Sequence, residues 1–179
     1  MKIEVNEFKI ELLNDAMYTP DSADNKYQYD EVFGSKDCIS SKHGIILSHN
    51  EEIRRSIIIL ETGGATGIHD TCYVVIDNYL YLCVGNRVYK IQIPELCILW
   101  SVQVDMATAF QIIRMHDDLI VHGELNISRL NQNGKIIWTE SGSDIFVTES
   151  GKNDFKIEND RILAESWDGR KYTFNYDGS

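Results

Sequence analysis

Short apolar runs alternate with polar turn residues over most of the chain. Tyr73–Ile76 and Leu80–Val84, for example, are separated by the turn Asp77-Asn78 and followed by the turn Gly85-Asn86. Runs of this kind, rich in β-branched and aromatic residues and bounded by Gly, Asn and Asp, are typical of antiparallel strands joined by hairpins. Long amphipathic helical periods are absent from the sequence, so we expect no helical crossovers and therefore no parallel sheet. The pattern predicts an all-β protein.

One part of the pattern occurs twice. Residues Ile76–Trp100 begin at a polar turn and end at a tryptophan, and Met115–Trp138 repeat the same order of apolar and polar positions. A third, shorter copy follows without a closing tryptophan strand. Repeats of about 40 residues made of short strands are typical of propeller blades and related stacked β-meanders. We expect meanders at residues 73–102, 111–139 and 155–176, with equivalent buried positions at Leu80, Leu119 and Ile162.

The repeats define the expected domain organisation. At 179 residues the chain is long enough for a single domain with its own core. Within this domain, residues 1–72 form an irregular N-terminal part and residues 73–179 form three meanders, the last one truncated. A closed propeller needs about four blades, and the first 40 residues keep none of the spacing of the repeat. We therefore predict an open or incomplete propeller-like stack, with a small closed four-bladed propeller or a β-sandwich as alternatives.

Composition narrows the possible partners and location. The formal net charge is −11, from 28 acidic and 17 basic residues. Such a surface repels phosphate backbones and anionic lipids, so neither nucleic acid nor a membrane is expected as a partner. No apolar run approaches the ~20 residues that span a bilayer. The four cysteines lack paired zinc-ligand spacing, and Cys83 and Cys97 lie in apolar strand-like runs, where reduced cysteine commonly packs as a small hydrophobic residue. We therefore expect a reducing compartment, the cytoplasm.

An acidic, aromatic-containing segment at residues 19–36 is the first candidate site. It has no sustained apolar period, so we expect a surface loop. Acidic and aromatic side chains together suit a surface that holds a basic protein. The candidate protein-binding residues are Asp21, Asp24, Tyr27, Tyr29, Asp30 and Glu31. The alternative is that the aromatic side chains fold back onto the body of the protein.

A second candidate site is the segment Glu61–Asp70, which contains three glycines and a His-Asp pair. The glycines superficially resemble a phosphate-binding loop, but a strand rather than a helix follows, so a tight turn or bulge explains them better. Histidine and carboxylate residues could in addition form a metal or proton-transfer site. The residues of this alternative ligand site are Gly63, Gly64, Thr66, His69, Asp70, His122 and Glu124. Because no complete metal-ligand motif is present, we expect no bound metal and no cofactor.

The closing strand Asn133–Trp138 carries a family resemblance. It resembles the repeats of the pyrroloquinoline-quinone-type (PQQ-type) β-propeller superfamily, in which a short strand ending in tryptophan packs between blades. The resemblance covers residues 73–179, departs from that family in the number of repeats, and carries over no cofactor site. The chain also resembles small uncharacterised bacterial proteins, some of which occur in toxin and immunity loci. That second resemblance implies an acidic, immunity-type inhibitor of a basic toxin.

Two functional hypotheses follow from the sequence. The leading hypothesis is a non-catalytic protein-binding module that uses the acidic segment 19–36 to hold another, basic protein. The rival hypothesis is a small-ligand-binding or metal-dependent enzyme centred on the Gly63–Asp70 loop with His122 and Glu124. A converging pocket at that loop would favour the rival, whereas an acidic docking face would favour the module.

Overall fold

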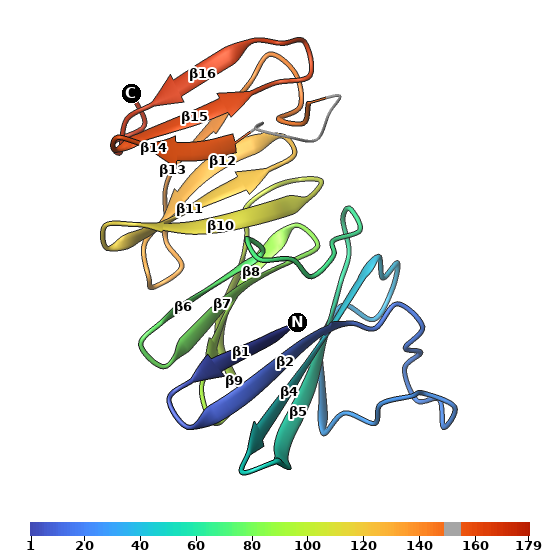
Figure 1. The fold of residues 1–179 in the computed structure, drawn as a ribbon. Helices are drawn as coiled ribbons and strands as arrows, with labels where there is room; N and C mark the ends of the chain where they lie inside the picture. Colours follow the sequence, from blue (N-terminus) through green and yellow to red (C-terminus); the bar gives the residue numbers. More distant parts are fainter. Residues whose placement is uncertain (149–154) are drawn as a thin grey trace.

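A computed structural model describes residues 1–148 and 155–179, and its regular elements in these residues are all β-strands. The strands form four small sheets that lie one after another in chain order (Figure 1). The all-β prediction is therefore confirmed. Over the same residues, no helix has the length and apolar character that crossing a bilayer requires.

Each sheet has its own strand order. The first sheet, in the order β1-β2-β4-β5-β3, contains β1 (Lys2–Val5), β2 (Phe8–Asn14), β3 (Glu31–Gly34), β4 (Ser41–His49) and β5 (Glu52–Glu61). The second sheet contains β6 (Tyr73–Ile76), β7 (Tyr79–Val84), β8 (Arg87–Gln92) and β9 (Cys97–Gln103). The third sheet contains β10 (Ala109–Met115), β11 (Asp118–Gly123), β12 (Asn126–Leu130) and β13 (Ile136–Ser141). The fourth sheet contains β14 (Phe155–Glu158), β15 (Arg161–Glu165) and β16 (Lys171–Phe174).

The three predicted meanders are present and share one register. Leu80, Leu119 and Ile162 each occupy the second paired position after the first hairpin turn of their sheet, and each is 0% exposed. His116 lies in such a turn with φ of 55°, close to the 53° of Asp77 in the previous sheet. Positive φ at the first turn residue is what a two-residue hairpin requires, and Asn, Asp and His adopt it more readily than most residues. The repeat in the sequence is thus a repeat in the structure.

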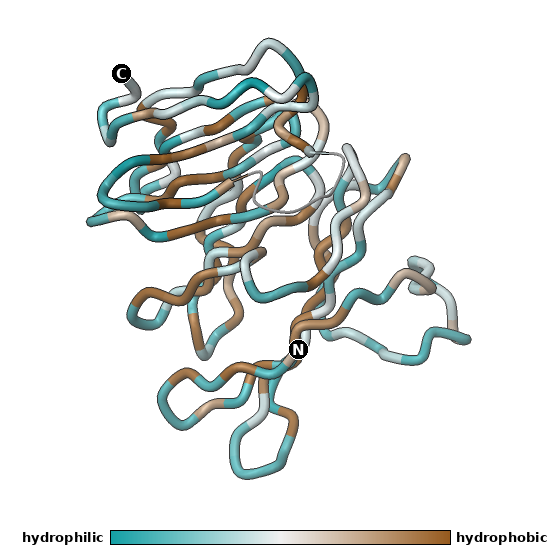
Figure 2. The backbone as a smooth tube through the Cα atoms, turned by 45° about the horizontal axis from the view of Figure 1, so that its top comes forward, coloured by the Kyte–Doolittle hydropathy of each residue, from teal (hydrophilic) through white to brown (hydrophobic). Residues whose placement is uncertain are grey.

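Apolar cores lie between successive sheets. Ile57 of the first sheet packs in one cluster with Leu80 of the second. On the opposite face of the second sheet, Cys83 packs in a cluster with Leu119 of the third. Period-two alternation along β7 explains this division, because successive side chains point to opposite faces of a sheet. A third cluster joins the third and fourth sheets in the same way. Figure 2 shows the apolar segments concentrated where the sheets face one another.

The stack is open because its two end faces are polar. Lys9 has the place in the first sheet that Leu80 has in the second, since each follows its hairpin turn by one paired residue. On the outward face of the fourth sheet, Lys156 and Thr173 are exposed. Ring closure would bury these groups against each other without dedicated partners, which costs free energy. No core cluster in the described residues joins the fourth sheet to the first, so the closed four-bladed alternative is not formed.

The two repeated tryptophans connect neighbouring sheets, as the sequence predicted. The Trp100 indole Nε1 donates a hydrogen bond of 3.2 Å to the carbonyl of Gln132, in the next sheet's last turn. The Trp138 indole likewise donates to the carbonyl of Tyr176, at 3.0 Å. A Cβ atom added to Gly134 would lie 2.8 Å from the Trp100 ring, so glycine lets this turn lie flat on the indole. These contacts make the tryptophans structural anchors of the stack.

The first 72 residues are more regular than the sequence predicted, because they contain the whole five-stranded first sheet. Residues 50–55 form the β4–β5 turn and the start of β5. Strand β3 lies inside the segment expected to be a loop, and it pairs with β5 in parallel. The other strand pairs in the described residues are antiparallel, so no parallel sheet is formed. No helical crossover is needed here, because β4, which comes between β3 and β5 in the sequence and is antiparallel to β5, returns the chain to the starting end of the sheet.

Candidate functional site

Residues 15–40, which we call the cap, cover the outer face of the first sheet. Tyr18 of the cap is buried with Ile58 and Leu60 of β5, and Tyr29 packs against this cluster. The Tyr29 ring lies edge-on to Tyr18 with centroids 5.5 Å apart. A Cβ atom on Gly44 would lie 2.2 Å from the Tyr29 hydroxyl, so the glycine in β4 makes room for this ring. The cap is therefore an integral part of the first sheet.

Three of the six predicted protein-binding residues hold the cap in place. The Tyr29 hydroxyl donates to Asp15 Oδ2 at 3.0 Å, and burial together with that carboxylate raises the pKa of Tyr29. The Asp30 carboxylate accepts hydrogen bonds from the Ser56 backbone N–H at 2.7 Å and from its hydroxyl at 3.1 Å. Glu31 forms an ion pair with Arg55. These three side chains therefore stabilise the cap through contacts within the protein, a role that neither their residue type nor their spacing in the sequence predicted.

The other three candidates lie at the surface. Asp21 and Asp24 are exposed, and Tyr27 is half-buried. The ammonium group of Lys26 lies 5.0 Å from the centre of the Tyr27 ring. The cap as a whole carries six carboxylates and two lysines. It therefore presents net negative charge with one aromatic ring accessible beside it.

A groove of about 410 Å³ runs beside β3 on the outer face of the first sheet. Its apolar lining comes from Tyr18, Pro20, Val32, Phe33 and Leu60, and its charged lining is one residue of each sign, Asp21 and Lys36. Val32 is 48% exposed there. Beyond β3 the first sheet has no further strand within the residues that the structure describes. The cap thus combines negative charge, an apolar groove and the free edge of a strand.

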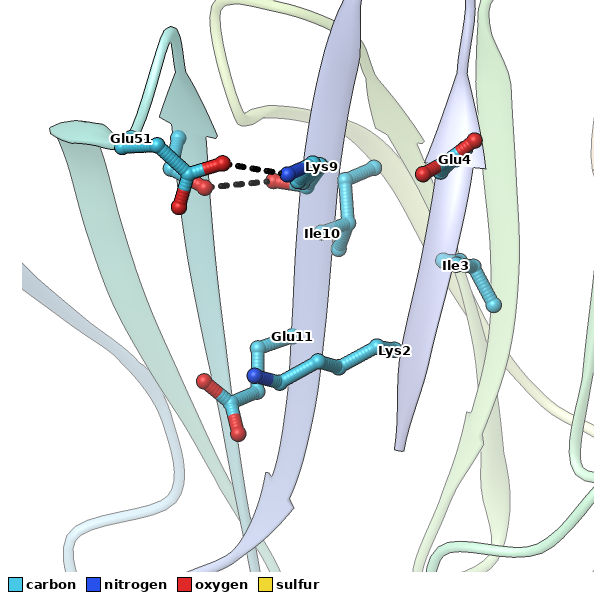
Figure 3. Close-up of a pocket in the computed structure, with 8 residues that line it drawn as sticks. Lys2, Ile3, Glu4, Lys9, Ile10, Glu11 and Glu51 are labelled. Carbon is cyan, nitrogen blue, oxygen red and sulfur yellow. Dashed lines mark hydrogen bonds and ion pairs between the residues drawn. The ribbon is translucent and has the colours of Figure 1, made fainter.

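A second hollow, of about 410 Å³, lies over β1, β2 and the β4–β5 turn (Figure 3). Charged side chains of both signs line it, and Lys9 forms an ion pair with Glu51 across it. Figure 3 shows Lys2 and Glu11 extending side by side at its other end. Because positive and negative groups alternate within this hollow, it selects for neither anions nor cations.

The Gly63–Asp70 loop is bonded to the sheets around it. The Thr66 hydroxyl accepts a hydrogen bond of 3.0 Å from the Gly85 backbone N–H and donates one of 2.9 Å to Ser41 Oγ. The Gly64 N–H donates to the carbonyl of Ala107 at 2.7 Å. A Cβ atom on Gly64 would lie 1.7 Å from Thr108 Oγ1, and Gly63 has φ of +91°. Turn geometry thus explains Gly63 and close packing explains Gly64, whereas Gly67 has neither a positive φ nor an atom within 4 Å of an added Cβ.

The remaining residues of the alternative ligand site do not converge. His69 and Asp70 are exposed, and His69 Nδ1 contacts the Thr71 hydroxyl at 3.1 Å. His122 is 1% exposed, and its ring stacks on Phe155 with centroids 4.8 Å apart. His122 Nε2 lies 2.7 Å from the carbonyl oxygen of Phe146, a contact in the core between the third and fourth sheets.

Glu124 is two residues after His122, a spacing that places both side chains on one face of a continuous strand. Strand β11 ends at Gly123, so Glu124 instead lies in the following turn. There its carboxylate accepts a hydrogen bond of 2.8 Å from the Thr108 hydroxyl. Among residues 1–148 and 155–179, no group of three His, Cys, Asp or Glu side chains is arranged to hold a metal ion.

We expect the purified protein to bind no stoichiometric zinc, because these side chains are directed to separate partners. Elemental analysis after dialysis against zinc should give well under one ion per chain, and a chelator should leave the thermal midpoint unchanged. One zinc ion per chain, lost on His122→Ala substitution but kept in the exposed-site control His116→Ala, would contradict this expectation and restore the metal-dependent alternative.

His43 is a buried histidine that the sequence analysis did not single out. It is 0% exposed and lies between the first and second sheets, where its Nε2 contacts the carbonyl oxygen of Thr66 at 3.1 Å. Burial is the main cause that lowers the pKa of His43 to about 4. The sequence contained one indication that His43 is buried. It lies two residues before Ile45 in an apolar strand, so both side chains are on the same face of that strand.

Comparisons with known proteins inform the fold alone. No protein-family model matches the chain, and no curated protein matches it. Among solved structures, the chain is similar to the crystal structure of the computationally designed Ika4 protein. The TM-score is 0.53 at 12% sequence identity, over 80% of this chain and 89% of that chain.

Proposed function

We propose that the protein is a non-catalytic binding module that holds a basic protein partner through its cap. The observation that carries this proposal is the composition and placement of the cap. Its surplus of carboxylates lies on an ordered segment, Asp21 lines the apolar groove, and both Asp21 and Asp24 are exposed. Negative potential accelerates encounter with a basic partner, and burial of apolar groups then slows dissociation.

The family resemblances of the sequence suggest which kind of binding protein this is. An immunity-type inhibitor of a basic toxin, located in the cytoplasm, would have the chemistry that the cap offers. All four cysteines are free thiols, which suits a reducing compartment. The resemblance to PQQ-type repeats supports a stacked scaffold for this binding surface. It does not imply a cofactor.

Neutralising the exposed carboxylates of the cap should slow association with the partner. Once affinity capture and mass spectrometry identify the partner, we expect the Asp21→Asn/Asp24→Asn variant to associate roughly threefold or more slowly at low ionic strength. The difference should shrink as salt rises, since the screening length is ~8 Å at physiological ionic strength. Asparagine is the right replacement at Asp21, whose φ of 62° asparagine tolerates. Stopped-flow or surface-based kinetics measures the rates.

The matched control is Glu158→Gln/Asp160→Asn, which makes the same change of net charge on the fourth sheet. Equal association rates for the two double variants would contradict the placement of the interface on the cap. Tyr27→Ala probes the apolar contact and should mainly speed dissociation. Tyr29→Ala is unsuitable for that purpose, because Tyr29 packs inside the cap against Tyr18.

A further inference from the structure

We propose that the partner contributes an extended segment that adds to the first sheet as a strand along the free edge of β3. The segment would carry apolar and basic side chains in alternation. This inference rests on the proposed function, that the cap binds a basic protein, and it names the part of that protein that is recognised.

The position of β3 supports strand addition. It extends the first sheet beyond β5 as a fifth strand, and its opposite edge has no partner strand in the described part of the chain. An edge strand presents backbone N–H and C=O groups that another extended chain can pair with. Peptide recognition by strand addition takes its affinity from these backbone hydrogen bonds and its specificity from pockets for alternate side chains.

The two faces of β3 define the side chains of the added strand. Val32 pairs with Ile58, which belongs to the cluster under the cap, so Val32 faces the apolar groove. Glu31 pairs with Ile57, which belongs to the core between the first two sheets, so the Glu31 side chain leaves on the opposite face. Directly opposed side chains in a sheet interact, and opposite charges there are favourable. The added strand would therefore place apolar side chains beside Val32 and basic ones beside Glu31, whose carboxylate is paired with Arg55 but is still 43% exposed.

The outermost strands β9, β13 and β16 are less suited to this partner. The outermost strands β9 and β13 each carry a register shift against their neighbours. Such irregularities twist and bend an edge and hinder further pairing. The hollow beside β16 is lined by Lys156, Lys171 and Glu165, so it lacks the surplus of carboxylates that the cap carries. Among these edges, β3 combines a regular pairing, a groove and negative surroundings.

Synthetic peptides test the proposal without knowledge of the partner. The probe is an eight-residue peptide of alternating valine and lysine, acetylated and amidated, with a fluorescent label. Two further peptides carry backbone N-methyl groups on all valines or on all lysines. In an extended strand the backbone N–H groups of successive residues point to opposite edges, so only one of the two methylated peptides has its methyl groups on the edge that faces β3. That peptide cannot donate hydrogen bonds to β3. We expect the parent peptide to bind, one methylated peptide to bind at least about tenfold more weakly, and the other to bind like the parent.

Two variants locate the peptide. Val32→Lys should weaken binding of the parent peptide by about tenfold, because it places a like charge in the groove. Ile53→Lys is the matched control, since Ile53 is 69% exposed on β5 outside the groove. It makes the same change of charge and should leave binding unaltered. Fluorescence anisotropy gives the affinities, and circular dichroism checks that both variants fold.

Several results would overturn the inference. One is no binding of the parent peptide at about 1 mM; another is equal binding of all three peptides; a third is an equal effect of the two lysine substitutions. A concentration-dependent dimer that Val32→Lys abolishes would assign the edge to a second copy of this chain instead. The proposed function is tested separately, since it fails if Asp21→Asn/Asp24→Asn slows partner association no more than Glu158→Gln/Asp160→Asn does.

Discussion

Replacing Leu119 with alanine is expected to lower the free energy of unfolding by ~2–5 kcal/mol, the range for a large-to-small change in a packed core. Leu119 is 0% exposed and lies in the cluster that joins the second and third sheets, together with Cys83 and Val121. Because this cluster holds the two halves of the stack together, little rearrangement can fill the cavity. A loss of this size is a large share of the stability of a typical domain.

Urea unfolding followed by tryptophan fluorescence measures the change. Leu99→Ala is the matched control, because Leu99 is 47% exposed and its truncation should change the free energy of unfolding by about 0.5 kcal/mol or less. If Leu119→Ala cost no more than Leu99→Ala, the assignment of Leu119 to a buried position of the repeat would be wrong. A change in the slope of the denaturant dependence would show that the two halves unfold separately.

The sequence was sufficient to predict the repeated half of the fold. The equal spacing of Leu80 and Leu119 from their turns reflects local hairpins, whose register is set by turn chemistry and by alternation of apolar residues. The prediction of Ile162 as the third equivalent position succeeded for the same reason. Pairing between strands that are close in the sequence can be predicted from the number of residues between turn and apolar positions.

The cap could not be predicted in the same way. Strand β3 has four residues, and its partner β5 lies more than twenty residues away, so no local period marks the pairing. The role of Tyr29 depends on the space above Gly44, which only the tertiary structure reveals. Acidic and aromatic composition therefore pointed to the cap without separating the residues that hold it from those at its surface.

The alternative ligand site shows a related difficulty. His122 and Glu124 have the spacing that places two side chains on one strand face, but the strand ends between them. Alternation along β11 directs His122 toward the fourth sheet, whereas Leu119 faces the second. Spacing gives the direction of a side chain only as long as the strand continues.

Lowering the pH from 7 to 4 is expected to destabilise the protein through His43. The folded state keeps the pKa of His43 at about 4, below the ordinary value of 6.5 that it has when unfolded. Between these two values the unfolded chain binds a proton that the folded chain excludes, so stability is full above pH 6.5 and falls as the pH drops toward 4. At 1.36 kcal/mol for each pKa unit, the total loss is about 3 kcal/mol.

The test compares the pH dependence of urea unfolding in the wild type and in His43→Gln, which keeps a polar side chain opposite the Thr66 carbonyl. The variant should lose less stability between pH 6.5 and 4 than the wild type, by about 3 kcal/mol. Acidic residues titrate in the same range, so the difference between the two proteins is the quantity to measure. His116→Gln is the control, because the His116 side chain is 51% exposed and contacts Asp160 at the surface, so its removal should change the slope much less than removal of the buried His43. Parallel curves for the wild type and His43→Gln would show that His43 does not exclude its proton on folding, and that the core between the first two sheets is more accessible to water than its burial indicates.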